Sequence, residues 1–67
     1  MQSGIKTASE VLDIIKKTIV CFGGFEWMYT GEKIKVKCRE GYAYMTEAEF
    51  LKHFDGGKTL IPFRTMY

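Results

Sequence analysis

The chain has 67 residues, which allows one domain with a modest core, so we do not expect an extended enzyme with several pockets. Hydrophobic residues make up 46% of the sequence, a composition typical of a folded globule and not of a disordered tail. The net charge of +2 is too small by itself to indicate a nucleic-acid-binding protein, so the positions of the charges matter more than their sum.

The two cysteines, Cys21 and Cys38, have no CxxC or other metal-ligand spacing. We therefore expect two reduced thiols that point into the core, and no metal or cofactor. No run approaches the about 20 apolar residues that span a bilayer, and the first ten residues lack the apolar segment of a signal peptide. These features predict a cytoplasmic protein that does not enter a membrane.

The first helix is predicted to follow residues 1–6, which we expect to be a flexible lead-in. Thr7 and Glu10 have the spacing of a capping box, in which each side chain binds an otherwise unpaired backbone N–H. Apolar residues then recur at three- and four-residue spacing, which predicts an amphipathic helix against a core. They are Ala8, Val11, Leu12, Ile15 and Ile19.

The end of this helix has two interpretations. Residues 18–22 continue the apolar stripe, which favours a helix running to about Cys21, with Gly23 and Gly24 as its left-handed cap. The same residues are β-branched and aromatic, so they also fit a strand that a Gly23-Gly24 hairpin joins to Phe25–Tyr29.

Three strand-like runs follow over residues 25–45, separated by Thr30-Gly31 and Glu40-Gly41. Two-residue hairpin loops at both corners give registers that agree on which side chains share a face. The face predicted to meet the core carries Phe25, Trp27, Ile34, Val36, Cys38, Ala43 and Met45. The other face carries Glu26, Met28, Lys33, Lys35, Lys37, Arg39, Tyr42 and Tyr44.

A second helix is predicted from a second capping box, formed by Thr46 and Glu49. Its apolar face is Phe50, Leu51 and Phe54, and Gly56-Gly57 ends it. Residues 58–63 then predict a short strand. Because Pro62 has no N–H donor, we expect that strand at a sheet edge, followed by a flexible tail over residues 64–67.

The predicted fold is a two-layer α+β domain spanning residues 1–67, in the order α-β-β-β-α-β. Its antiparallel sheet has three or four strands, made of the meander 25–45 and the edge strand 58–63, and two helices cover one face. An exposed edge at residues 58–63 would also allow a homodimer by strand pairing.

Catalytic groups are not evident in the sequence. The only histidine, His53, lies on the outward side of the second predicted helix, away from both cysteines, so no nucleophile has an obvious base. Neither phosphate-loop glycine spacing occurs. We therefore expect a protein that is not an enzyme.

The outer sheet face carries the most promising group of residues. Four cations at two-residue spacing lie beside two tyrosines of the next strand, a combination that suits an acidic protein surface, or a phosphodiester backbone with bases stacked on the rings. Alternating charges also occur simply on solvated faces. The candidate partner-binding residues are Lys33, Lys35, Lys37, Arg39, Tyr42 and Tyr44.

The order of elements over residues 7–55 resembles that of double-stranded-RNA-binding domains and HicA-type toxins. Those RNA-binding domains open their second helix with lysines, whereas this chain has Glu47 and Glu49 there. The toxins' catalytic histidine has no counterpart in the meander. The resemblance therefore implies an element order and neither activity.

The function that the sequence favours is a small regulatory protein that binds another protein, in the manner of inhibitors or accessory factors encoded by phages or bacteria. An acidic protein surface is the expected partner. The alternative is a small RNA- or DNA-binding module that uses the basic and aromatic sheet face.

Overall fold

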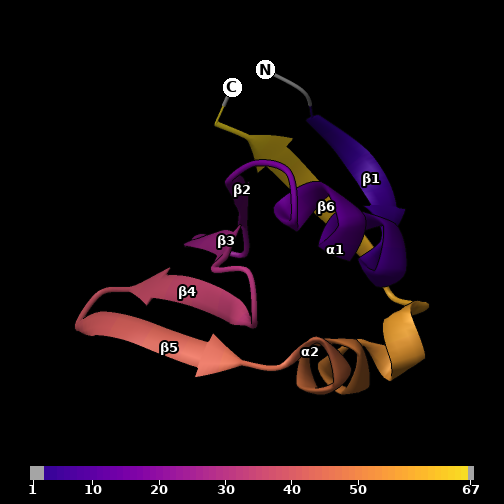
Figure 1. The fold of residues 1–67 in the computed structure, drawn as a ribbon. Coiled ribbons are helices and arrows are strands. Elements are labelled where there is room, and N and C mark those ends of the chain that lie inside the picture. Colours follow the sequence, from indigo (N-terminus) through magenta and orange to yellow (C-terminus); the bar gives the residue numbers. More distant parts are fainter. Residues whose placement is uncertain (1–2, 67) are drawn as a thin grey trace.

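A computed structural model describes residues 3–66 as two helices packed on one face of a strongly bent antiparallel sheet (Figure 1). This confirms the predicted α+β class and its antiparallel sheet, but the sheet has six strands, in the order β1-β6-β2-β3-β4-β5. The strands are β1 Ser3–Thr7, β2 Val20–Phe22, β3 Phe25–Tyr29, β4 Ile34–Cys38, β5 Gly41–Met45 and β6 Leu60–Thr65. The helices are α1 Ala8–Ile15 and α2 Glu47–His53, and a single 3-10 turn, η1 Asp55–Gly57, follows α2.

Both predicted capping boxes are present. The Thr7 hydroxyl accepts a hydrogen bond from the Glu10 backbone N–H, and the Glu10 carboxylate accepts one from the Thr7 backbone N–H. Thr46 and Glu49 make the same pair of bonds at α2. Hydrogen bonds from the Thr7 hydroxyl and then from its backbone N–H lower the pKa of Glu10, because the ionised carboxylate is the better acceptor. The Thr46 backbone N–H, and then its side chain, lower the pKa of Glu49 in the same way.

The preferred extension of the first helix to about Cys21 is wrong. Helix α1 ends at Ile15, and Val20–Phe22 forms β2, which pairs with β3 from Phe22↔Phe25 to Val20↔Trp27. Gly23 and Gly24 have φ angles of +61° and +82°, as a type I′ hairpin requires, so the tight-turn interpretation is the one realised.

The two ends of the chain also differ from expectation. Residues 3–6, within the predicted flexible lead-in, belong to β1, and β6 continues through Thr65 into the predicted tail. β1 and β6 pair with each other from Ser3↔Arg64 to Thr7↔Leu60. The remaining parts of those two predictions, residues 1–2 and 67, lie outside the described residues.

β6 is therefore not the edge strand that the proline predicted. It lies between β1 and β2, although β2 pairs only with Arg64 and Thr65, so Pro62 lies beyond that ladder. Because residue 62 has no strand partner on the side that faces β2, the N–H that proline lacks there costs the sheet no hydrogen bond. A homodimer through residues 58–63 would have to use the side of β6 that faces β2, because the other side pairs with β1. The edges of the sheet are β1 and β5.

The registers of the meander differ from the prediction by two residues, and the faces are those predicted. Trp27 pairs with Val36, and Val36 with Ala43. The first loop is longer than two residues, because Thr30 and Lys33 close it through their backbone and the Thr30 hydroxyl. The second loop is shifted to Arg39-Glu40. Since side chains alternate with a period of two, a shift of two leaves every side chain on its predicted face.

The core lies between the helices and the inner face, defined here as the sheet face that carries Trp27. Trp27 stacks on Phe22 with ring centroids 4.5 Å apart, and Phe50 of α2 meets the indole edge-on at 5.5 Å. The remaining buried apolar residues surround these rings. They include Val11 and Ile15 of α1, Ile34 and Val36 of β4, and Ile61 and Phe63 of β6.

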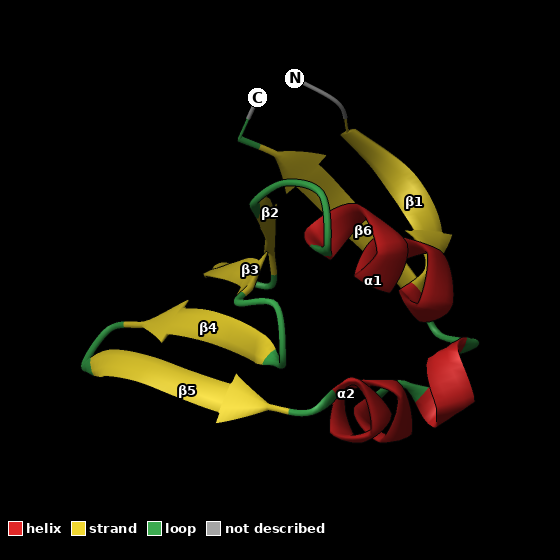
Figure 2. Ribbon diagram, in the orientation of Figure 1, coloured by secondary structure: helices red, strands yellow, loops and turns green. Residues whose placement is uncertain are grey.

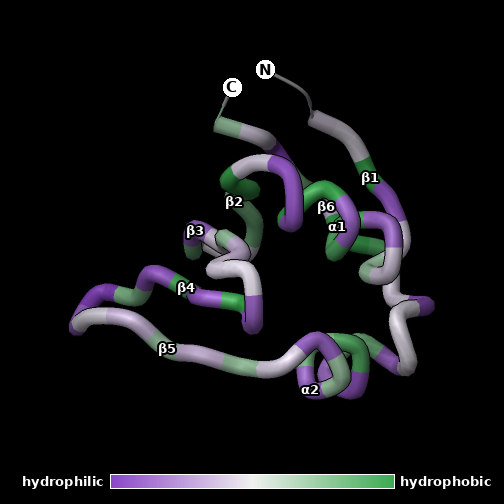
Figure 3. Tube along the Cα trace, in the orientation of Figure 1, coloured by the Kyte–Doolittle hydropathy of each residue, from purple (hydrophilic) through white to green (hydrophobic). Residues whose placement is uncertain are grey.

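The β4–β5 hairpin projects away from this core (Figure 2). Along β4 hydrophobic and hydrophilic residues alternate (Figure 3), and its hydrophobic positions Ile34 and Val36 are buried. In β5, by contrast, Gly41–Tyr44 are all exposed, including Ala43 on the inner face, and only Met45 is half-buried. The helices thus cover the inner face less completely than predicted.

Candidate partner-binding face

All six residues predicted for partner binding gather on the β4–β5 hairpin. Lys35 and Lys37 lie on β4 and Tyr42 and Tyr44 on β5, with cross-strand pairs Lys37↔Tyr42 and Lys35↔Tyr44. Lys33 and Arg39 lie in the flanking loops, at positions of the same alternation. We call these six residues the basic–aromatic patch. Its role in binding stays a prediction.

The lysines of this patch lie over its tyrosine rings. The Lys35 ammonium is 4.0 Å from the centroid of the Tyr42 ring, and that of Lys33 is 5.2 Å from the Tyr44 ring. Both contacts are diagonal across the strand pair, which long side chains can span. Each tyrosine remains 53% exposed, so positive charge and aromatic surface are presented together to solvent.

Acidic residues partly offset this charge. The Lys37 ammonium lies 3.9 Å from a carboxylate oxygen of Glu26 on β3, and both side chains are substantially exposed. At that distance and exposure the ion pair is weak and screened by salt. Glu32 and Glu40 are adjacent to Lys33 and Arg39 in the sequence and also offset part of the positive charge.

The outer face, opposite Trp27, also has an apolar end on β1 and β6. Ile5 and Pro62 are directly paired there, and Ile5 and Leu60 are each 65% exposed. The continuous register Arg64↔Cys21↔Glu26↔Lys37 connects this end to the basic–aromatic patch. Cys21 therefore lies on the outer face and half-buried, contrary to the inward position predicted for it.

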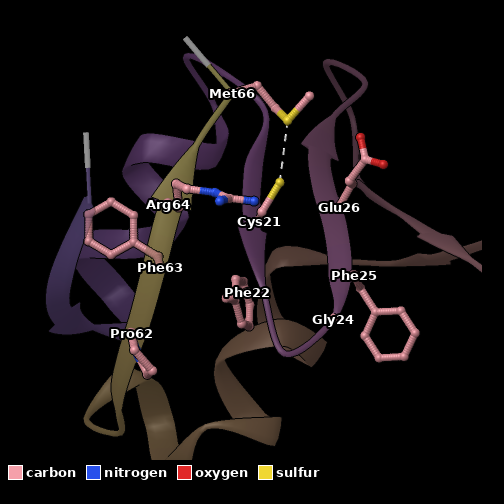
Figure 4. Close-up of a pocket in the computed structure, with 9 residues that line it drawn as sticks. All are labelled: Cys21, Phe22, Gly24, Phe25, Glu26, Pro62, Phe63, Arg64 and Met66. Atoms are coloured by element: carbon pink, nitrogen blue, oxygen red, sulfur yellow. Dashed lines mark hydrogen bonds between the residues drawn. The ribbon is translucent and has the colours of Figure 1, made fainter. Parts of the chain in front are cut away.

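A hollow of about 640 Å³ opens where β2 and β6 diverge. Its walls include Phe22, Pro62 and Phe63, and the Arg64 side chain reaches across it towards Cys21 (Figure 4). The Cys21 thiol is 3.4 Å from the Met66 sulfur at one end. Sequence reasoning missed this hollow because it depends on β6 lying beside β2.

A second group that the sequence did not reveal joins three elements. The Lys16 ammonium, just after α1, lies 2.6 Å from one carboxylate oxygen of Glu47, and the Tyr29 hydroxyl donates to the other at 2.9 Å. The bond to Lys16, then that to Tyr29, lowers the pKa of Glu47. The same contacts with Glu47 raise the pKa values of Lys16 and Tyr29. Both carboxylate oxygens of Glu47 are thus occupied by contacts within the fold, and the group links the end of α1, β3 and α2.

Groups for nucleophilic or metal chemistry are dispersed over the described part of the chain. His53 is exposed on α2, and both cysteines are free and half-buried. Within residues 3–66, no three histidine, cysteine or acidic side chains are placed to hold a metal ion. Over the same residues, no helix is long and apolar enough to cross a membrane.

No family model matches the chain, and searches of curated proteins and of solved structures find no significant match. The function proposed below therefore rests on the geometry of the described residues.

Proposed function

We propose that this protein is a small, non-enzymatic binding protein that regulates or inhibits another protein by contacting an acidic surface on it. The observation that carries this proposal is the basic–aromatic patch. It combines four cations, partly offset by neighbouring acidic residues, with two half-exposed tyrosines on a hairpin that projects from the core.

The composition of the patch fits protein recognition. Tyrosine and arginine are enriched where protein interfaces concentrate their binding energy, and tyrosine offers contact area at a low cost in conformational entropy. The positive row would steer an acidic partner towards the hairpin and fix its orientation. Because β4 is anchored in the core through Ile34 and Val36, the patch is presented on a rigid element.

Nucleic acid is the second candidate, favoured by the same cations and rings. Two contacts make it the weaker proposal. Lys33 and Lys35 already lie over the tyrosine rings, so a stacking base would have to displace them from that ring face. Lys37 faces the Glu26 carboxylate, which would repel a phosphate.

Affinity capture from the native host with three baits tests the proposal. The baits are the wild type, a patch variant Lys35→Glu/Lys37→Glu, and a control Lys52→Glu/Lys58→Glu with the same change in net charge on exposed residues elsewhere. We expect the wild type and the control to recover one protein that the patch variant loses. Recovery of no protein, or equal recovery by all three baits, would contradict the proposal.

Titration with short RNA and DNA tests the alternative. Nucleic-acid binding should perturb the amide signals of residues 33–44 at low salt and weaken steeply as salt rises, through counterion release. Unchanged spectra at low salt would remove this candidate.

A further inference from the structure

β5 is an edge strand without the protection that edge strands usually carry. Its sequence, Gly-Tyr-Ala-Tyr-Met, contains no charge and no proline, and among the described strands only β4 pairs with it. The opposite edge, β1, carries Lys6, whose ammonium lies 4.0 Å from a Glu10 carboxylate oxygen. Lysines on an edge strand discourage a further strand from pairing, and β5 itself has none.

The backbone of β5 is open to a further strand. In an antiparallel pair, every second residue turns its N–H and C=O away from its partner strand, so the free side of β5 presents such groups to solvent. Exposure of Gly41–Tyr44 on both faces leaves room for the side chains of an additional strand.

We infer that β5 accepts an extended acidic segment of a partner protein as an additional strand of the sheet. This inference rests on the proposed function and specifies how the partner binds. Strand addition takes its affinity from backbone hydrogen bonds and its specificity from alternate side chains, so the chemistry beside β5 defines the occupant.

The outer side of the added strand meets positive charge. A neighbouring strand lies about 4.8 Å away, which places its outward side chains beside Tyr42 and Tyr44. The ammonium groups of Lys35 and Lys33 lie over those two rings, at 4.0 and 5.2 Å from their centroids. Glutamate or aspartate at the outward positions would pair with these lysines.

The inner side of the added strand meets a different surface. It adjoins Ala43, which is exposed, and Met45, which is half-buried and packs against the core. Apolar side chains at the inward positions would extend that contact. The expected occupant is therefore an extended segment of alternating acidic and apolar residues.

A second copy of this chain fits the edge poorly. Pairing β5 with β5 would place the Tyr42 and Tyr44 rings of the two copies on neighbouring strands, with the lysine ammonium groups of each copy over its own rings. Like charges brought together across a strand pair repel, which disfavours this pairing. An acidic segment replaces this repulsion with attraction.

A titration with blocked peptides tests the inference, followed by amide signals of the isotope-labelled full chain. The parent peptide alternates glutamate and valine. We expect shifts concentrated in Gly41–Met45 and affinity lowered by more than about tenfold when lysine replaces each glutamate. Proline at two adjacent central positions, one valine and one glutamate, should abolish binding, because in either strand direction one of these two positions donates its N–H to β5.

Two variants of the protein complete the design. Lys33→Glu/Lys35→Glu should weaken binding of the parent peptide by more than about tenfold, whereas Lys52→Glu/Lys58→Glu should leave it within about twofold. Circular dichroism of each variant confirms that it is folded.

Four results would overturn the inference. If the proline peptide binds as tightly as the parent, the contact is made by side chains alone, and the proposed function stands without strand addition. If shifts in Gly41–Met45 and a doubled mass appear on concentrating the protein alone, the occupant is a second copy. If short RNA displaces the parent peptide, the patch binds nucleic acid. The absence of any shift with the parent peptide would also overturn it.

Discussion

Trp27 is the residue on which the core depends most. Its indole ring contacts the rings of Phe22, Phe50 and Phe54, and its ring nitrogen donates to the Phe22 carbonyl at 3.2 Å. Only 8% of it is exposed. One side chain thereby connects the β2–β3 hairpin to α2, which is distant from it in sequence.

Trp27→Ala should lower the free energy of unfolding by about 3–5 kcal/mol, because it leaves a cavity among aromatic rings. Chemical denaturation measures the change. The control Tyr42→Ala removes an exposed ring with one lysine contact and should cost less than about 1 kcal/mol. Similar losses in the two variants would mean that Trp27 is not buried as described.

Glu47 gives the fold a dependence on pH. Because its pKa is lowered from the ordinary value of 4.5, first by Lys16 and then by Tyr29, its contribution to stability is present above that value. The contribution is lost as the pH falls through the pKa of the folded protein. Lys16, whose pKa is raised, keeps its charge until well above neutral pH, so acidification acts through Glu47.

Glu47→Gln should therefore have a lower midpoint of thermal unfolding than the wild type at about pH 7, and the difference should shrink as the pH falls below 4.5 and Glu47 of the folded protein becomes protonated. Melting curves across this range measure it. Glu40→Gln, in the β4–β5 turn, is the matched control and should follow the wild type. A difference that persists unchanged at low pH would contradict the assigned role of the Glu47 carboxylate.

At the scale of elements, η1 fixes how α1 and α2 approach each other. Gly57 is buried with φ +91°, and a β carbon there would lie 2.9 Å from a Leu51 methyl and 3.1 Å from the Ser9 side chain. Gly56 has a similar φ of +67°, but no atom lies within 4 Å of its added β carbon. Alanine substitutions at these two adjacent glycines therefore distinguish the free-energy cost of backbone strain from that of a steric clash.

Gly56→Ala should cost about 1–2 kcal/mol through left-handed backbone strain alone. Gly57→Ala should cost about 1–3 kcal/mol more, because the new methyl group must displace Leu51 and Ser9. Denaturant unfolding of both variants measures the difference. Equal losses would show that α1 and α2 have room to separate.

Local signals predicted the helix starts and the faces of the meander. Thr7 and Thr46 each form a capping box with the glutamate three residues further on. The side chains of residues 34–38 alternate between the two sheet faces, and a register shift of two residues leaves each on its predicted face. The end of α1 was mispredicted because residues 18–22 satisfy both helix periodicity and strand propensity. Tertiary pairing with Trp27 and Thr65 decides between them.

At the scale of the whole molecule, the missing information was long-range pairing. Ile5 pairs with Pro62 although 57 positions separate them, and neither residue carries a strand pattern that indicates the other. The six residues of the patch were identifiable from alternation alone. The free edge of the sheet at β5 could not be identified in this way. The edge strands depend on where β1 and β6 join the sheet.

Hydrogen exchange of the protein, alone and in complex with a captured partner, tests the proposed binding surface most directly. We predict slower amide exchange at Gly41–Met45 in the complex, together with unchanged exchange in β1 and in the residues that line the hollow between β2 and β6. Protection confined to β1 or to that hollow, with none at β5, would contradict the account.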